Sequence, residues 1–399
     1  MDLDLTDREA IHSPASYFAR AREKSGDVQW SDHHRAWVLL SHAEVEAAFR
    51  ESEVLSADRS GSFARVARSR GEAFQVVVDL LTNWMNFRDP PVHTRLREPV
   101  RTVFTPRAVA KLESDIQEIV DSVLDGFDGD AVDLGAAFAR SIPALVIAAI
   151  LGVDAADRGR FQGWSDDIAK MVFSMEPGSA DDAPVVAAAS EFWAFFGRLV
   201  ERERVHPTGT LLTAIVQHRN SDLTEAELIG LCTLILFGGH ETTTTLLTSS
   251  LALLLEQPER MQWLRENPDG YATAIEEFMR VGGPARTMPR KIASTHERGG
   301  RTLEAGQNAF LCIAAANHDE DVFTDPGTVD LTRDPNPQLG FGWGVHFCLG
   351  ANLARLEATV ALRTLLDRFP RIRAAGPIPE VRASAMGFGR RPIHVSLGK

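Results

Sequence analysis

The sequence predicts a mainly α-helical protein that carries a few small β-sheets. Residues 108–220 are rich in alanine and repeat their apolar positions at helical spacing, with breaks near Pro177 and Pro207. A long helix is expected over residues 224–257, roughly 50 Å at about 1.5 Å per residue. Runs typical of strands are short and lie at residues 37–40, 302–303 and 309–313.

Length, charge and cysteine content exclude several classes of protein. The 399 residues, 44% of them hydrophobic, suffice for one large core or two modest domains. A net charge of −13 argues against nucleic acid as the main partner. Three cysteines at wide spacing predict no disulfide framework, which fits a reducing cytoplasm. Residues 1–5 are acidic and begin neither a signal peptide nor a membrane anchor, so we expect a soluble, cytoplasmic protein.

The N-terminal quarter alternates helices with one strand and one irregular stretch. A helix is expected before the strand at residues 37–40, and a second one over residues 42–49. Residues 56–83 carry scattered arginines and serines around one amphipathic piece, residues 72–81, and we interpret them as an adaptable loop over a pocket.

Two prolines then start a helix that presents a basic pair. Pro90 and Pro91 suit a helix entrance. His93 and Arg97 lie four residues apart and therefore on one face. Taken alone, they fit a solvated basic face equally well. Pro99 should kink this helix.

The long helix begins with a Thr-x-x-Glu capping box at Thr224. Apolar residues on nearly every side predict that it is buried. A membrane span is rejected because residues 238–242, Gly-Gly-His-Glu-Thr, interrupt the apolar run, and charge is costly in lipid. Glycines there cost about 1 kcal/mol each relative to alanine but leave room for a flat cofactor. The bland alternative is a kinked core helix with a satisfied polar patch.

A glycine-rich loop presents one cysteine just before another helix. Residues 341–350 complete the spacing Phe-x-x-Gly-x-x-x-Cys-x-Gly, with the cysteine at Cys348. Glycines permit backbone angles that other residues avoid, so the loop can lie against a flat ligand. Free N–H groups and the dipole at the helix start favour a thiolate, which can bind a metal. A lone Gly-x-Cys would more simply be a buried cysteine before a helix.

Four motifs in this order resemble the cytochrome P450 family, and the resemblance covers the chain from Trp37 to its C-terminal strands. Besides the cysteine loop, the glycine pair and the basic pair, it includes Glu277 and Arg280, a Glu-x-x-Arg that the family uses as a structural brace. The resemblance implies a cytochrome P450 fold, a single haem domain over residues 1–399 with the long helix over haem b. It also implies that two helices, residues 157–173 and 184–204, form a lid over the substrate.

The resemblance also implies roles for individual residues. Cys348 would be the axial ligand of haem iron, and such a thiolate favours O–O cleavage. Glu241 and Thr242 would form the oxygen-activating acid–alcohol pair. Haem propionates would be bound by His93, Arg97, Arg290 and His346. The remaining cofactor contacts would come from Gly238, Phe341 and Gly350.

The function expected from these features is insertion of one oxygen atom from O₂ into a hydrophobic small molecule, such as a natural product or lipid. Because the length leaves no room for a flavin or iron–sulfur domain, electrons should come from a ferredoxin and its reductase. A basic stretch, Arg95, Arg101, Arg107 and Lys111, would attract an acidic donor. The alternatives are a haem sensor or carrier and a haem-thiolate peroxygenase or isomerase, neither of which needs the Glu241–Thr242 pair.

One further hypothesis concerns the strand that follows Gly282–Pro284. By resemblance Arg286 and Met288 would face the substrate pocket, where an arginine is unusual. A buried guanidinium needs a partner, and a carboxylate suits it. Arg286 would then anchor an anionic substrate group. The alternatives are a third propionate contact and a side chain turned to solvent.

Overall fold

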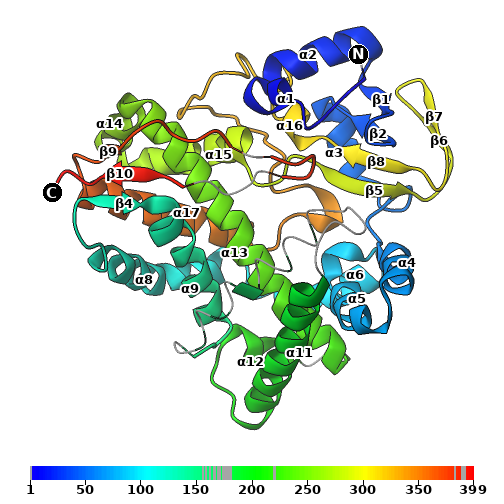
Figure 1. Ribbon diagram of the computed structural model, residues 1–399, viewed down its shortest axis with the longest axis horizontal. Helices are drawn as coiled ribbons and strands as arrows, with labels where there is room; N and C mark the ends of the chain where they lie inside the picture. Colours follow the sequence, from blue (N-terminus) through cyan, green and yellow to red (C-terminus); the bar gives the residue numbers. More distant parts are fainter. Residues whose placement is uncertain are drawn as a thin grey trace. The chain divides into compact units, whose positions relative to one another are not determined.

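The computed structural model describes residues 2–154, 157, 160, 163–164, 168, 172, 182–218, 222–381, 383–387 and 392–399. The chain divides into two compact units. Unit 1 comprises Met1–Ser56, Glu113–Ser141 and Thr242–Lys399, and unit 2 comprises Ala57–Leu112 and Ile142–Glu241. All strands of the described residues belong to unit 1, whereas unit 2 is helical (Figure 1). The prediction of a mainly α protein with small sheets is confirmed.

Both units contain several helices. Those of unit 1 are α1 (Arg8–His12), α2 (Pro14–Ser25), α3 (His42–Arg50), α8 (Glu113–Asp125), α14 (Pro258–Glu266), α15 (Tyr271–Gly282), α16 (Ile313–Ala316) and α17 (Ala351–Arg368). Those of unit 2 are α4 (Ser60–Arg70), α5 (Gln75–Thr82), α6 (Val92–Arg101), α7 (Pro106–Val109), α9 (Ser141–Ile150), α11 (Asp182–Val205) and α12 (Leu211–Val216). The long helix α13 (Glu225–Glu256) begins in unit 2 and continues into unit 1 at Thr242.

The largest sheet has five strands in the order β1-β2-β8-β5-β3. Only β2 and β8 pair in parallel; the other neighbours are antiparallel. The strands are β1 (Val28–Ser31), β2 (Ala36–Leu39), β8 (Asn308–Leu311), β5 (Met288–Ile292) and β3 (Leu55–Ser56). Smaller sheets are formed by β4 (Ala131–Asp133), β10 (His394–Ser396) and β9 (Arg373–Ala374), and by β6 (His296–Arg298) and β7 (Arg301–Leu303).

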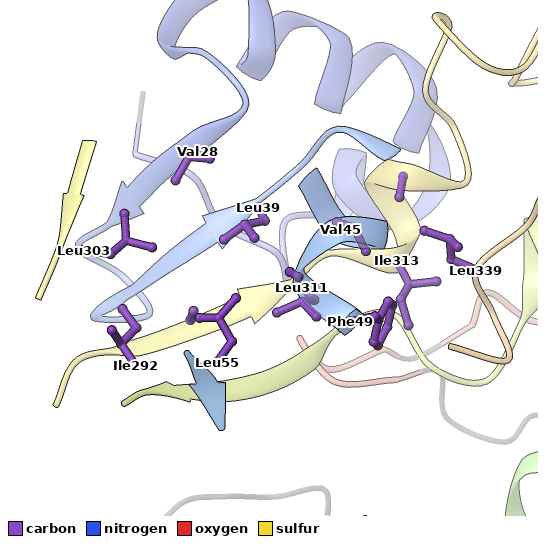
Figure 2. Packing of buried hydrophobic residues seen from close by; sticks show 13 residues of the cluster. Val28, Leu39, Val45, Phe49, Leu55, Ile292, Leu303, Leu311, Ile313 and Leu339 are labelled. Carbon is purple, nitrogen blue, oxygen red and sulfur yellow. The ribbon is translucent and has the colours of Figure 1, made fainter. Parts of the chain in front are cut away.

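Both faces of the large sheet are buried, as the alternation along β2 shows. Leu39 belongs to a cluster that includes Phe49 of α3 and Ile313 of α16 (Figure 2). Val38, its neighbour in the strand, belongs to a second cluster with Leu5 and other N-terminal residues. Successive side chains of a strand point to opposite faces. The N-terminal segment is therefore part of the core, and each fully buried Leu or Val contributes about 1.5–3 kcal/mol.

The adaptable loop expected at residues 56–83 is wrong, because helix α4 forms at Ser60–Arg70, whereas α5 agrees with the amphipathic piece expected at residues 72–81. The many arginines and serines lower the hydropathy of α4, which made its sequence resemble a loop. Tertiary contacts stabilise it: Ala67 is buried, and Arg70 forms an ion pair with Asp182 of α11 and lies 5.0 Å from the ring of Phe74. The helix expected at residues 157–173 lies largely outside the described residues, while α11 confirms the helix expected at residues 184–204; the lid role of this pair stays a prediction.

Two expectations about helix ends can be compared with the structure. The capping box of α13 is confirmed: the Thr224 N–H donates to Glu227 Oε2 at 2.9 Å, and the Glu227 N–H donates to Thr224 Oγ1 at 3.3 Å. Pro99 lies in the last turn of α6, which ends two residues later at Arg101.

Among helices of the described residues, α11 is long and apolar enough to cross a membrane by length and composition. In unit 2 it packs against α5 and α12, as a core helix does.

Candidate functional site

The cysteine loop of unit 1 is closed by its own backbone. The Cys348 N–H donates to the Phe341 carbonyl at 2.8 Å. Gly342 and Gly344 both have φ of +69°, which other residues rarely adopt. A Cβ on Gly344 would also lie 2.6 Å from the Phe49 carbonyl oxygen. The glycines are therefore required for the loop to pack on α3, and helix α17 begins at Ala351, three residues after the cysteine.

Cys348 differs from the other two cysteines in its environment. Burial raises the pKa of Cys232 to about 12 and that of Cys312 to about 11, so both remain thiols at neutral pH. Cys348 is partly exposed. Of the three cysteines, Cys348 is therefore the one suited to act as a thiolate ligand.

The two ends of the loop differ in their surroundings. Phe341 is buried, and the Arg355 guanidinium of α17 lies 4.3 Å from the centre of its ring. Arg355 also donates to Glu276 of α15 at 3.0 Å. A Cβ on Gly350 would meet no atom within 4 Å, so the loop has open space beside this residue. The loop is rigidly attached on one side and open on another.

Strand β5 brings Arg290 to the same part of unit 1. The Arg290 guanidinium lies 5.7 Å from the ring of Phe49, the residue whose carbonyl approaches Gly344. Its Nη1 donates to the Pro289 carbonyl at 3.0 Å. His346 belongs to the 3₁₀ turn Gly344–His346 inside the loop. The structure thus brings Arg290 and the cysteine loop together around Phe49.

Unit 2 holds four of the predicted residues on α6 and α13, and Thr242 is the first residue of α13 in unit 1. His93 is buried on α6, and Arg97 lies one turn further along this helix. On α13 a Cβ at Gly238 would meet no atom within 4 Å. Glu241 is buried, and its Oε1 lies 3.3 Å from Nδ1 of His240. These two side chains are successive in the helix, so the close approach joins two ionisable groups at its midpoint.

The two adjacent glycines of α13 have different roles. A Cβ on Gly239 would lie 2.9 Å from Ile147 of α9, so Gly239 permits close packing of two helices. Only Gly238 of this pair has open space beside it. The expectation that both glycines leave room for a cofactor is therefore wrong for Gly239.

Comparison with known proteins identifies the family. A family model described as Cytochrome P450 matches residues 200–392. Nocardicin C N-oxygenase of Nocardia uniformis subsp. tsuyamanensis is 36% identical over 384 residues, which are 95% of this chain and 93% of that protein. The chain belongs to the cytochrome P450 family. Vitamin D(3) 25-hydroxylase of Pseudonocardia autotrophica is also 36% identical, over 91% of this chain and 88% of that protein.

A solved structure agrees with this assignment. P450BioI in complex with hexadec-9Z-enoic acid ligated acyl carrier protein superimposes with a TM-score of 0.88 at 29% identity, over 97% of this chain and 99% of that one. This cytochrome P450 is accordingly a monooxygenase with haem b as cofactor. It acts on a small molecule and takes electrons from a redox partner.

The residues present fit haem b. Open space beside Gly350 and Gly238 is what a flat macrocycle next to each segment requires. A cysteine that is not buried can supply the thiolate. Two imidazoles and two guanidiniums, those of His93, His346, Arg97 and Arg290, are the donor types that bind carboxylates such as propionates.

Arg286 has protein carbonyls as its acceptors where the hypothesis expected an anionic substrate group. Its guanidinium is fully buried and donates to the carbonyls of Leu5 at 2.7 Å, Ser384 at 2.9 Å and Ala10 at 3.0 Å. Burial lowers the pKa of this guanidinium, and the carbonyl dipoles compensate its charge. Arg286 instead joins the N-terminal segment to the C-terminal part of unit 1. Met288 packs against the sheet core, and its place in a pocket stays a prediction.

Sequence reasoning missed one buried acid of this P450. Glu357 of α17 is fully buried, burial raises its pKa to about 8, and its Oε1 makes no hydrogen bond within the described residues. It lies nine residues after Cys348. Its position among Leu353, Val360 and Ala361, on the apolar face of α17, was the available signal.

Proposed function

We propose that Cys348 is the axial ligand of the haem iron and that unit 1 and unit 2 act as a single haem domain. The observation that supports this most is the state of the three cysteines. Cys232 and Cys312 are buried thiols, whereas Cys348 is partly exposed in a loop with open space at Gly350. A thiolate ligand makes O–O cleavage at the haem more favourable.

Four cationic or imidazole side chains are proposed to bind the haem propionates. His93 and Arg97 are positioned by α6, Arg290 by β5 and His346 by the cysteine loop. Gly238, Phe341 and Gly350 would contact the macrocycle. The close approach of Arg290 to Phe49, which also contacts the loop, supports a shared function for the strand and the loop.

Glu241 and Thr242 are proposed to deliver protons during oxygen activation. Glu241 is buried beside His240, so its carboxylate is held in a defined orientation. The Thr242 hydroxyl follows it on α13 and would pass the proton on from this carboxylate. A carboxylate that transfers a proton contributes typically about 10²–10⁴-fold to rate.

The substrate is proposed to be a hydrophobic natural product or lipid-like molecule that is hydroxylated or epoxidised. Relatives named for nocardicin C N-oxygenation and for vitamin D(3) hydroxylation support this class. The donor is proposed to be a ferredoxin with its reductase, in the cytoplasm. In the predicted basic stretch, Arg95 pairs with Glu227 and the exposed Arg101 pairs with Glu98; Arg107 and Lys111 are exposed as well.

The proton-delivery roles are tested by Thr242→Ala and Glu241→Gln, with Thr243→Ala as the matched control on the same helix. Thr242→Ala should keep substrate affinity but divert electrons to hydrogen peroxide, and Glu241→Gln should slow turnover about 100-fold. Both are measured as product and peroxide formed per electron consumed. If both variants keep the rate and coupling of the control, the relay lies elsewhere. Equal turnover driven by peroxide alone would support the peroxygenase alternative.

A further inference from the structure

The N-terminal segment is held on unit 1 by polar contacts that fix Asp4. Leu3 and Leu5 on either side are buried in the core. Ser31 Oγ donates to the Leu3 carbonyl at 2.7 Å. The Asp4 backbone N–H donates to the Tyr17 hydroxyl at 3.1 Å, and that hydroxyl donates to the Asp4 carbonyl at 2.9 Å. The Asp4 carboxylate therefore projects from an ordered backbone.

Two successive histidines face this carboxylate from the turn between β1 and β2. His33 and His34 lie in the turn, with ring centroids 4.7 Å apart and ring planes nearly perpendicular. Arg35 completes the turn with φ of +50°. The Asp2 carboxylate accepts the N–H of Asp32 at 3.1 Å and that of His33 at 2.7 Å. The turn is thus bound to the N-terminal segment independently of the imidazoles.

The three side chains converge at distances that suit a metal ion. Asp4 Oδ1 lies 3.7 Å from Nε2 of His33 and 3.6 Å from Nε2 of His34. Potential ligand atoms of all three residues lie within 4.8 Å of one another, and no other such group of His, Cys, Asp or Glu occurs in the part of the chain that the structure describes. Metal–ligand bonds of about 2.0–2.2 Å in a tetrahedral site separate ligand atoms by about 3.4 Å.

We propose that Asp4, His33 and His34 form a binding site for Zn²⁺ or a similar divalent transition metal. Two imidazoles and one carboxylate are ligands that zinc accepts, with water at the fourth position. The side chain of His33 is 52% exposed, so the site opens to solvent on that side. A bound ion would join the N-terminal segment to the β1–β2 turn. None of the proposed haem residues takes part.

Groups around the three side chains both favour and disfavour binding of a metal ion. Burial, and then the neighbouring His33, lower the pKa of His34, which keeps its imidazole neutral at neutral pH. Although burial opposes it, hydrogen bonds from Thr6 lower the pKa of Asp4, which keeps it ionised. The carboxylates of Asp4 and Asp2 raise the pKa of His34, and the charge of Arg286 lowers it. Against binding, His34 Nε2 already accepts the Leu5 N–H at 2.9 Å, so the ion must displace that donor.

The test titrates Zn²⁺ into the holoprotein, prepared without a histidine tag, and follows heat by calorimetry. We expect one ion per chain. Asp4→Asn, His33→Gln and His34→Gln should each weaken binding by more than about tenfold. The substituted amides still accept hydrogen bonds, so the bonds that Thr6 and the Leu5 N–H donate to these side chains can persist. His394→Gln, at an exposed histidine of β10, is the matched control and should bind as the wild type does.

A second measurement identifies the ligands of the bound zinc, so that binding at other histidines or a folding defect is not mistaken for loss of this site. The X-ray absorption edge of zinc is distinct from that of haem iron, and it should report nitrogen and oxygen ligands at about 2.0 Å with imidazole scattering. If His34→Gln misfolds and loses its haem spectrum, the test depends on His33→Gln, because the half-exposed side chain of His33 is not needed for the core. Unchanged zinc affinity in His33→Gln and Asp4→Asn, or no binding by the wild type, would overturn the proposal.

Discussion

The cysteine loop and the segment from Arg280 to Arg286 belong to the same unit, yet they use chemically active residues in opposite ways. The loop leaves Cys348 partly exposed, while glycines and one backbone hydrogen bond create its shape. Both arginines are fully buried, and they donate to carbonyls or to Glu277. Within unit 1, the partly exposed Cys348 beside open space is therefore the candidate for chemistry, whereas the desolvated arginines with several protein acceptors belong to the scaffold.

The strongest test of this comparison is Cys348→Ser, which should remove chemistry and leave the fold. We expect complete loss of the thiolate-type spectrum of the ferrous carbonyl complex, with helical circular dichroism unchanged. Cys312→Ser, at a buried thiol, is the control and should keep that spectrum. A thiolate spectrum that persists in Cys348→Ser would contradict its assignment as axial ligand.

Arg280→Ala should have the opposite effect: it should lower the stability of the fold and leave the haem spectrum unchanged. Arg280 donates to Glu277 at 2.7 and 2.8 Å and to the carbonyls of Asn317, Pro326 and Thr328. Removing the guanidinium leaves the fully buried carboxylate of Glu277 without its main partner, which typically lowers the free energy of unfolding by about 3–5 kcal/mol. Arg333, 3.2 Å from Glu277, should limit the loss to the lower end. Urea unfolding measures it, and the carbonyl spectrum of the remaining folded protein should match that of the wild type.

Arg286→Leu should have a smaller effect of the same kind. The variant leaves the carbonyls of Leu5, Ala10 and Ser384 without their charged donor, at a cost of about 2–3 kcal/mol. Dissociation constants of a bound carboxylic acid and its methyl ester should change equally. A loss confined to the acid would support the hypothesis that Arg286 binds an anionic substrate.

Glu357 lies on the helix that follows the cysteine loop, and its effect on stability appears only as a dependence on pH. Its pKa of about 8 in the folded state exceeds the ordinary value of 4.5, so the unfolded chain ionises first as pH rises. Stability from the neutral acid is complete below about pH 4.5 and is lost as pH rises toward 8. The slope is at most about 1.4 kcal/mol per pH unit.

Glu357→Gln should flatten that dependence between about pH 5.5 and 7.5, as measured by urea unfolding of both proteins at each pH. Glu266→Gln, at an exposed glutamate of α14, should leave the slope of the wild type unchanged. Equal slopes for wild type and Glu357→Gln would mean that Glu357 is ionised when folded.

Several elements could be predicted because their determinants lie close together in the chain. The capping box of α13 uses residues three apart, and β2 and α3 follow from short patterns. α4 could not be predicted, because its polar sequence is stabilised by α5 and α11 rather than by its own hydrophobicity. Gly238 and Gly239 look equivalent in the sequence, and only the position of Ile147 distinguishes them.

The sequence by itself determined the family, the reaction class and the cysteine proposed to hold the haem. Those features depend on spacing within a loop of ten residues, where glycine conformations and a bond from Cys348 to Phe341 define the geometry locally. Only the tertiary structure decided the function of Arg286, whose acceptors Leu5 and Ser384 lie 281 and 98 residues away. A buried charge must find partners wherever packing brings the chain, so neighbouring residues do not specify them. For the same reason, the meeting of Asp4 with His33 and His34 became visible only after the N-terminal segment had packed on the sheet.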